Sequence, residues 1–306
     1  MTYLSFKGIK AITFDHSTIA RFTLLYLCTR LIHTRYYVGD QKERQWDKSM
    51  KKTFKFFLPK NPLVLCHGLM GFDKIGIELL KKRMISFPFI VLYYWKGIKE
   101  ILEENGAEVF ITSVPMMGTV EERSYVLHKQ IEDKYKGRKV NLIAHSMVCK
   151  MFEHYNSLDQ LKGGLDCRYL ISKINPKKYQ VGSLTTIATP HRGTYFANYC
   201  LKLINAFNIS KTRNLFSLIG VRTKVIEELT TAYMENVFNK NVINDPNVLY
   251  FSYGASFVPS FFNIFWLSWN KINKAEGIND GLVSVKSSVW GDYKGTLENA
   301  NHIILV

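Results

Sequence analysis

The chain has 306 residues, of which 47% are hydrophobic and 22% are charged. This ordinary globular composition excludes a disordered, collagenous or low-complexity protein, and the lack of a long uncharged apolar run argues against a polytopic membrane protein. The net charge is +16, and residues 1–60 carry half of it because they hold 12 Lys/Arg and 4 Asp/Glu. Such a balance suits nucleic acid, an anionic membrane, a targeting segment or a solvated surface, but no nucleic-acid motif is present.

The N-terminal segment, from Met1 to about Val38, is basic and poor in acidic residues. Residues 19–32 are typical of a helix, but two arginines interrupt it, so it is a poor membrane span and a poor secretory signal. An arginine-bearing, acid-poor start resembles a mitochondrial presequence, which predicts residues 1–60 as a basic extension and a mitochondrial targeting segment. The alternative is an ordinary helix packed on the domain, and Asp15 weakens the targeting interpretation.

The five cysteines are an odd number and include no C-x-x-C motif. They therefore predict no disulfide framework and suit a reducing compartment.

From Asn61 onward, short apolar runs alternate with longer helical stretches. The expected strands are Pro62–Cys66, Glu108–Thr112, Val140–Ala144, Leu184–Ala188 and Val248–Ser252. Helical patterns between them include Tyr94–Asn105 and Thr119–Gly137. This alternation predicts an α/β fold with a mostly parallel sheet and helices on both faces. In such sheets the chemistry lies beyond the carboxyl ends of the strands.

A serine follows the third expected strand, in Ala144-His145-Ser146-Met147. A serine on a sharp strand-to-helix turn is a nucleophile elbow, with backbone N–H groups at the helix start facing an oxyanion. Val148 stands where the G-x-S-x-G pattern has glycine, and a serine after a strand is more often a helix cap.

Three further features point to the same chemistry. His67-Gly68 follows the first strand, and such a turn can aim the next N–H, that of Leu69, at the same oxyanion. Asp280 and His302 lie downstream, which gives the order Ser, Asp, His of an α/β-hydrolase triad. The other turn histidines, His67, His145 and His191, are interpreted as structural.

Five ordered blocks carry a resemblance to the true triacylglycerol lipases, a family of the α/β-hydrolase superfamily with yeast mitochondrial and secreted bacterial members. The blocks are Pro62–Asp73, Tyr94–Ile98, Val140–Ser146, Ala188–Gly193 and Asn279–Val283. The resemblance implies an α/β-hydrolase domain over 61–306, no cofactor and a lipid ester substrate, and together with the basic N-terminus it implies a mitochondrial location. Peripheral contact with a membrane or lipid-droplet surface is expected from the apolar segments described below. It also implies Ser146 as nucleophile, Asp280 as acid, His302 as base, and the N–H groups of Leu69 and Met147 as the oxyanion hole.

The chain departs from the family near its end. Bacterial members carry a calcium-binding aspartate two residues after the catalytic histidine, where this chain has Ile304, so no structural metal is expected. The chain also stops four residues past His302, which predicts weak anchoring of that histidine, because terminal residues fray unless they are tied down.

The elbow shows a larger departure. The family passes from Ser-Met directly to Gly-Gly, whereas here Gly163-Gly164 comes fifteen residues late. Removing Val148–Lys162 completes the elbow, and the inserted stretch begins with Val-Cys, which a common yeast 5′ splice signal encodes in this frame. One hypothesis is therefore a retained intron in the gene model. The alternative is a genuine longer helix, which the spacing of Met151, Tyr155 and Leu158 allows.

The substrate side has two candidate segments within an expected lid region of about 200–275. Residues 257–269 are dense in aromatics, and Cys200–Phe216 has apolar residues spaced for one helical face. Core packing is the alternative for the aromatic run.

Three other functions remain as alternatives to ester hydrolysis. They are an acyltransferase on the same fold, a lipid-binding homologue whose catalysis the insertion impairs, and, more distantly, a nucleic-acid binder.

Overall fold

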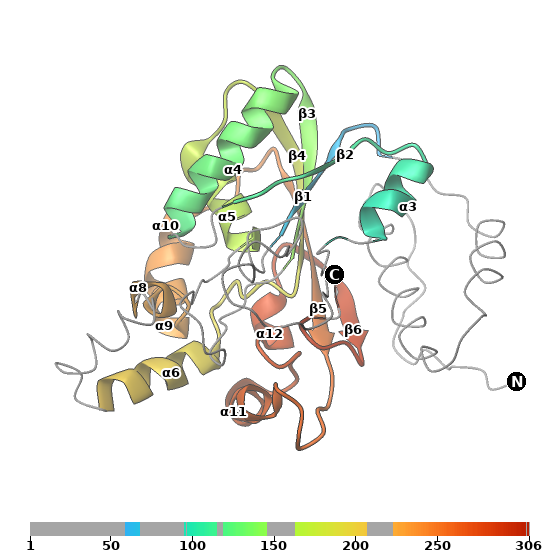
Figure 1. The fold of residues 1–306 in the computed structure, drawn as a ribbon. Helices are drawn as coiled ribbons and strands as arrows, with labels where there is room; N and C mark the ends of the chain where they lie inside the picture. The colour runs from blue at the N-terminus through green and yellow to red at the C-terminus, as the bar shows by residue number, and fades with distance from the viewer. Residues whose placement is uncertain are drawn as a thin grey trace, which may run out of the picture.

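The computed structural model describes residues 59–67, 95, 97–114, 119–145, 163–206, 223–303 and 305. Within these residues the chain forms a six-stranded sheet with the order β2-β1-β3-β4-β5-β6, in which all paired strands are parallel (Figure 1). The strands are β1 (Leu63–Cys66), β2 (Val109–Ile111), β3 (Lys139–His145), β4 (Gln180–Ile187), β5 (Leu249–Ser256) and β6 (Asp292–Glu298). The α/β-hydrolase architecture expected from the sequence is confirmed.

The helices lie between the strands along the chain, as parallel connections require. They are α3 (Ile98–Glu104), α4 (Val120–Tyr135), α5 (Gly163–Tyr169), α6 (Tyr195–Ala206), α8 (Thr223–Glu227), α9 (Thr231–Tyr233), α10 (Asn239–Asn241), α11 (Trp266–Glu276) and α12 (Val285–Ser288), with π-helical turns η2 (Leu170–Ile174) and η3 (Met234–Phe238). Helix α4 begins at a capping box, in which Thr119 Oγ1 accepts from Glu122 N and Glu122 Oε2 accepts from Thr119 N.

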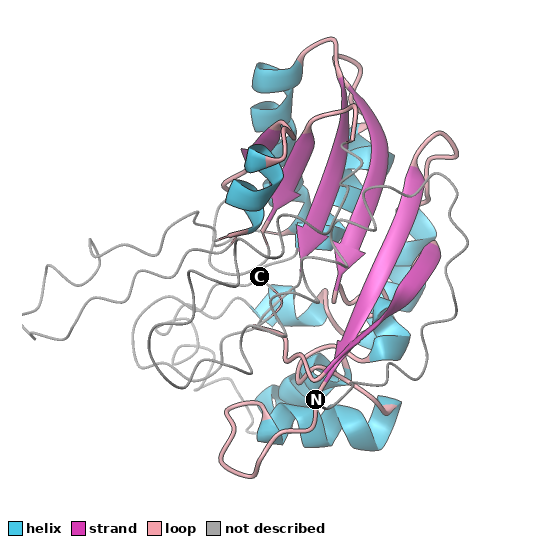
Figure 2. Cartoon of the chain, turned by 90° about the vertical axis from the view of Figure 1, so that its right-hand side faces the viewer, coloured by secondary structure: helices cyan, strands magenta, loops and turns pink. Residues whose placement is uncertain are grey.

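Alternate residues of the central strands enter two cores on opposite faces of the sheet. Leu63 and Leu65 of β1 join the core under α3, whereas Val64 and Cys66 join the core under α4 and α5. This alternation is the two-residue period of a strand that is buried on both sides. Figure 2 shows the sheet with helices before and behind it.

The five expected strands are all present, each within a few residues of its expected bounds. The edge strand β6 was not predicted, because Asp292–Glu298 is mostly half-buried and contains two acids, a lysine and a glycine. Its sequence therefore lacks the apolar run that marks a buried strand.

A third core lies beyond the carboxyl ends of the strands. It is built from α6, α8, η3 and α11 together with Leu282 and Val283. The expected lid region of about 200–275 is not one segment, because it contains the core strand β5 (Leu249–Ser256). The helical part of that range instead lies on both sides of β5 in sequence. None of the described helices is long and apolar enough to cross a membrane.

Candidate active site

The candidate site lies where the carboxyl ends of the parallel strands meet. Strand β3 ends at His145, directly before Ser146, and β1 ends directly before His67. Three expected site residues, Ser146, Leu69 and Met147, lie outside the described residues. The structure therefore defines the flanks of the expected nucleophile and oxyanion hole, together with the remaining two members, Asp280 and His302.

Asp280 is held in a tight loop. Its Oδ1 atom accepts hydrogen bonds from the backbone N–H groups of Leu282, at 3.0 Å, and Val283, at 2.8 Å. Gly281 has a φ of +100°, a conformation that favours glycine. The side chains of Leu282 and Val283 enter the third core, so packing fixes the loop that orients the carboxylate.

His302 meets the second oxygen of that carboxylate. The distance from His302 Nδ1 to Asp280 Oδ2 is 2.6 Å, and the His302 backbone N–H donates to the Asp280 carbonyl at 3.0 Å. Both side chains are fully buried. An Nδ1–H held by a carboxylate leaves Nε2 as the basic nitrogen, which is the arrangement of a general base in acyl transfer.

The expectation that His302 would be weakly anchored is wrong. The residue follows β6, and Ala300 N donates to the carbonyl of Ser256 at the end of β5 at 3.0 Å. Two hydrogen bonds to Asp280 then fix the histidine itself. Tertiary hydrogen bonding, rather than distance from the chain end, decides how firmly this position is held.

Asp280 does not directly follow a strand in the sequence, because α11 lies between β5 and Asp280. It still reaches the carboxyl end of β5, since Phe257 N donates to the Asn279 carbonyl at 3.2 Å.

His145 joins the site, although the sequence indicated only a structural role. Its ring centroid lies 5.2 Å from that of His302, and its side chain is hydrogen-bonded to the main chain of His302. Burial lowers the pKa of His145 well below its usual value. This contact places the residue before Ser146 beside the Asp280–His302 pair. Its position next to the expected nucleophile was the signal in the sequence.

Helix α5 begins against the ends of β1 and β3. A Cβ atom on Gly163 would lie 3.0 Å from the carbonyl oxygens of both His145 and His67, and one on Gly164 would lie 2.2 Å from Thr189 Oγ1. Only glycine permits this close approach without movement. The chain therefore leaves the sheet at His145 and returns to the same place at Gly163, where the helix after a nucleophile elbow begins.

A buried ion pair fixes α5 to α4. Arg123 Nε lies 2.8 Å from Asp166 Oδ2, with both side chains almost fully buried, and Ser124 Oγ donates to the Asp166 carbonyl at 2.9 Å. Breaking one partner of a buried pair is costly because it leaves an uncompensated charge. The position of α5 at the strand ends is thus determined by charge as well as by packing.

Three buried histidines predict a pH-dependent stability. Burial is the main cause that lowers the pKa of His67, to about 3, and that of His145 and His191 well below the usual value. The folded state keeps these rings neutral, whereas the unfolded chain protonates them near pH 6.5. The unfolding free energy should therefore fall as the pH drops below about 6.5, by up to about 1.4 kcal/mol per pH unit for each histidine.

Urea unfolding at several pH values between neutral and mildly acidic would measure this slope. We expect His67→Gln to reduce it, because one proton fewer is taken up on unfolding. A free energy of unfolding that is unchanged over this range would contradict the prediction.

Within the described parts of the chain, no three His, Cys, Asp or Glu side chains are grouped so as to hold a metal ion. The expectation that the protein needs no metal or cofactor stays a prediction.

The sequence comparisons agree with the expected resemblance. The chain is 36% identical over 297 aligned residues to Triacylglycerol lipase 2 of Saccharomyces cerevisiae, covering 84% of this chain and 83% of the yeast protein. It is 25% identical over 314 aligned residues to a triacylglycerol lipase of Pseudarthrobacter phenanthrenivorans, covering 79% and 87% of the two chains. No protein-family model matches the sequence.

Solved structures share the fold. The mature lipase BlEst2 of Bacillus licheniformis aligns with a TM-score of 0.56 at 21% identity, covering 80% of this chain and 86% of that one. EstA of Clostridium botulinum aligns with a TM-score of 0.54 at 18% identity, covering 90% and 92%. At these identities the likeness concerns the fold alone.

Proposed function

Because the chain belongs to the triacylglycerol lipase family, whose members are lipid-ester hydrolases, we propose that it cleaves acylglycerols with Ser146, Asp280 and His302 as a catalytic triad. The observation that carries this proposal is the buried 2.6 Å contact between His302 and Asp280, with His145 beside it at the end of β3. Ser146 follows His145 directly in the sequence, so the expected nucleophile is attached to the neighbour of the base.

The proposed reaction has two halves. Ser146 Oγ attacks the ester carbonyl carbon while His302 Nε2 takes the hydroxyl proton, and the negative oxygen of the tetrahedral intermediate is held by the N–H groups of Leu69 and Met147. The intermediate collapses, the ester C–O bond breaks, and His302 returns the proton to the leaving alcohol. Water, deprotonated by His302, then attacks the acyl-enzyme; the bond from the acyl carbon to Ser146 Oγ breaks, His302 returns the proton to Oγ, and the fatty acid is released.

Asp280 supports both halves without changing its own protonation state. Its carboxylate holds the Nδ1–H of His302 and stabilises the imidazolium that forms in each proton transfer. The two backbone donors on Oδ1, from Leu282 and Val283, keep the other oxygen aimed at His302 throughout.

We propose residues 61–306 as the hydrolase domain and the helices around β5 as the wall that meets the acyl chains. The mitochondrial location and residues 1–60 as a targeting segment belong to the same proposal, supported by the basic, acid-poor N-terminus. Apart from Pro59 and Lys60, this segment lies outside the described residues. Contact with a membrane or lipid-droplet surface follows from an insoluble substrate.

Product analysis tests the reaction against the acyltransferase alternative. The full chain is incubated with radiolabelled diacylglycerol, with and without an added sterol or diacylglycerol acceptor, beside its Ser146→Ala variant. We expect free fatty acid that depends on Ser146 and no acceptor ester. Acceptor ester as the main product would replace hydrolysis by acyl transfer.

A further inference from the structure

An apolar tip projects from the loop between β5 and α11. Its four side chains are 82%, 67%, 93% and 78% exposed; they are Val258, Phe261, Phe262 and Ile264. Single exposed apolar residues are common on soluble proteins, but contiguous exposed patches mark sites of interaction. Four such side chains within one short loop therefore indicate an interaction site for an apolar partner.

The loop holds these side chains outward. Asn263 N donates to the Ser260 carbonyl at 3.0 Å, and Asn263 Oδ1 accepts from Phe265 N at 2.9 Å, which closes a turn at the tip. The Phe261 ring meets the rings of Phe262 and Trp266 edge to face, with centroids 5.4 and 4.8 Å apart. Exposure of the tip is thus a property of an ordered turn.

The base of the tip rests on the candidate site. Phe257 and Phe265 pack against each other with centroids 6.1 Å apart, and the Trp269 indole N–H donates to the Phe257 carbonyl at 2.7 Å. A Cβ atom on Gly281, next to Asp280, would lie 2.8 Å from Phe265 Cβ and 3.1 Å from Phe257 Cε1. The two anchoring rings therefore pack directly on the loop that holds the catalytic acid.

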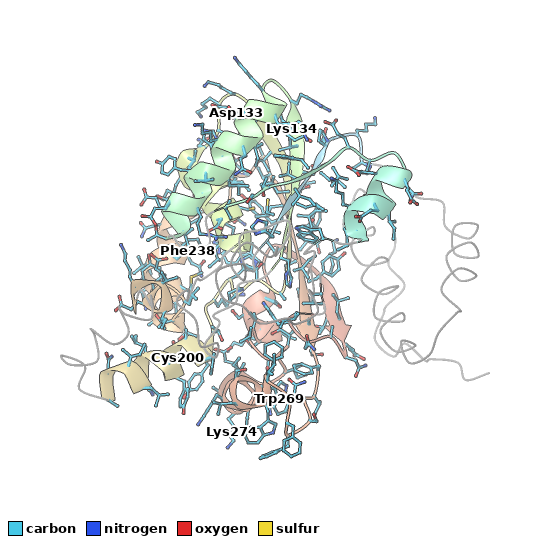
Figure 3. All side chains as sticks on the ribbon, in the orientation of Figure 1. Asp133, Lys134, Cys200, Phe238, Trp269 and Lys274 are labelled. Carbon is cyan, nitrogen blue, oxygen red and sulfur yellow. The ribbon has the colours of Figure 1, made fainter. Side chains whose placement is uncertain are left out.

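The tip, α6 and α11 occupy one end of the molecule. Helix α11 packs against α6, and both lie at the end toward which the arrowheads of β5 and β6 point in Figure 1. In Figure 3, Trp269 and Lys274 of α11 lie at this end with Cys200 of α6, whereas Asp133 and Lys134 lie at the opposite end. A flat partner that touched the tip would face the end of the sheet where the site lies.

The segments that form α6, the tip and α11 carry more lysines than acids. Residues 195–206 and 257–278, all of which the structure describes, contain three lysines, Lys202, Lys271 and Lys274, and a single acid, Glu276. That acid is half-buried and accepts a hydrogen bond from Tyr195 N at 3.0 Å. Lys271 Nζ lies 4.4 Å from the Tyr199 ring centroid, which suits an amphipathic side chain at an interface. Exposed apolar residues on the same end of the molecule as lysines, of which Lys274 is labelled there in Figure 3, match an anionic phospholipid surface.

We propose that the tip inserts into the surface of a bilayer containing anionic phospholipid and that the three lysines contact its headgroups. This proposal rests on the proposed function in one respect, because a lipid-ester substrate explains why the site should face a membrane. The binding itself does not require turnover and can be tested separately from it.

Flotation with lipid vesicles measures the binding. The full chain carrying Ser146→Ala is mixed with vesicles of phosphatidylcholine alone, or of phosphatidylcholine with one third phosphatidylglycerol, and the bound fraction is determined. Phe262→Ser and Val258→Ser are compared with Ile243→Ser, a similarly exposed apolar residue outside the tip. All variants keep the basic residues 1–60, so differences between them report on the tip, and thermal unfolding checks their folding.

We expect stronger binding to the anionic vesicles, a loss of about tenfold in Phe262→Ser, a smaller loss in Val258→Ser and no change in Ile243→Ser. Lys274→Gln should weaken binding to anionic vesicles by about fivefold and leave phosphatidylcholine binding unaltered. Equal binding of all variants would overturn the proposal. So would self-association, measured by sedimentation velocity, that Phe262→Ser abolishes, since a second copy would then cover the tip. Vesicle binding by this variant, combined with no ester turnover by either the full or the shortened chain that keeps Ser146, would refute the proposed function and leave this proposal standing.

Discussion

Deleting Val148–Lys162 is expected to raise ester hydrolysis by about 100- to 1000-fold, because one oxyanion donor contributes about that much to turnover. The deletion joins Met147 to Gly163, which already lies against the carbonyl oxygens of His145 and His67. A short connection can then pass from β3 into α5 as a nucleophile elbow does, with the Met147 N–H at the helix start. In the full chain, the β-branched Val148 follows Met147 at the position that Gly163 occupies in the shortened chain.

The measurement is the hydrolysis rate of a chromogenic medium-chain ester by the full and shortened chains. In the shortened chain, Ser146→Ala should abolish turnover. Gly163→Val should lower it strongly, since its Cβ would crowd the two carbonyl oxygens. Equal activity of both chains through Ser146 would show that the elbow tolerates the longer sequence. Sequencing the transcript across codons 147–163 tests the retained-intron hypothesis separately, because an unspliced message would contradict it.

Asp280→Asn is expected to reduce kcat by about 10⁴-fold with little change in the fold. The amide oxygen can still accept from the N–H groups of Leu282 and Val283, while the amide NH₂ faces His302 Nδ1. A donor at that position favours the tautomer that carries its proton on Nε2, which removes the general base. His302→Ala should lose a similar factor, and the two losses should not add, because both residues act through one group.

Asp133→Asn is the matched control for this substitution, because Asp133 is exposed at the opposite end of the molecule (Figure 3). It should leave kcat unchanged. Steady-state kinetics on the more active of the two chain forms, together with thermal unfolding, measures the effect. An Asp280→Asn variant that keeps its activity would exclude the buried pair from the catalytic mechanism.

The parallel sheet was predictable because its central strands are buried on both faces. Such strands are short apolar runs, and Val140–Ala144 shows this most clearly, with every residue buried. Edge strand β6 escaped prediction because it is only half-covered and carries charges. The sequence could not show which aromatic residues of the run 257–269 are buried and which are exposed, since the turn at Asn263 decides which rings point inward and which outward.

The candidate site was partly predictable for a different reason. Asp280 and His302 were found by their order along the chain and by family motifs, which report chemistry rather than contacts. The role of His145 and the packing of Gly163 depend on distances between the ends of β1, β3 and α5, and such distances are set only in the folded chain. The sequence likewise does not predict the hydrogen bonds that anchor His302, because they also depend on the folded chain.

Covalent labelling with a fluorophosphonate, followed by peptide mapping, tests the central claim most directly. The probe phosphonylates a serine hydroxyl that a neighbouring base activates and releases fluoride, so it reports the nucleophile and the base together. We expect the label on Ser146 in the chain lacking Val148–Lys162, and its loss in the His302→Ala variant of that chain. Labelling at another serine, or Ser146 left unmodified while the chain still hydrolyses esters, would contradict this account.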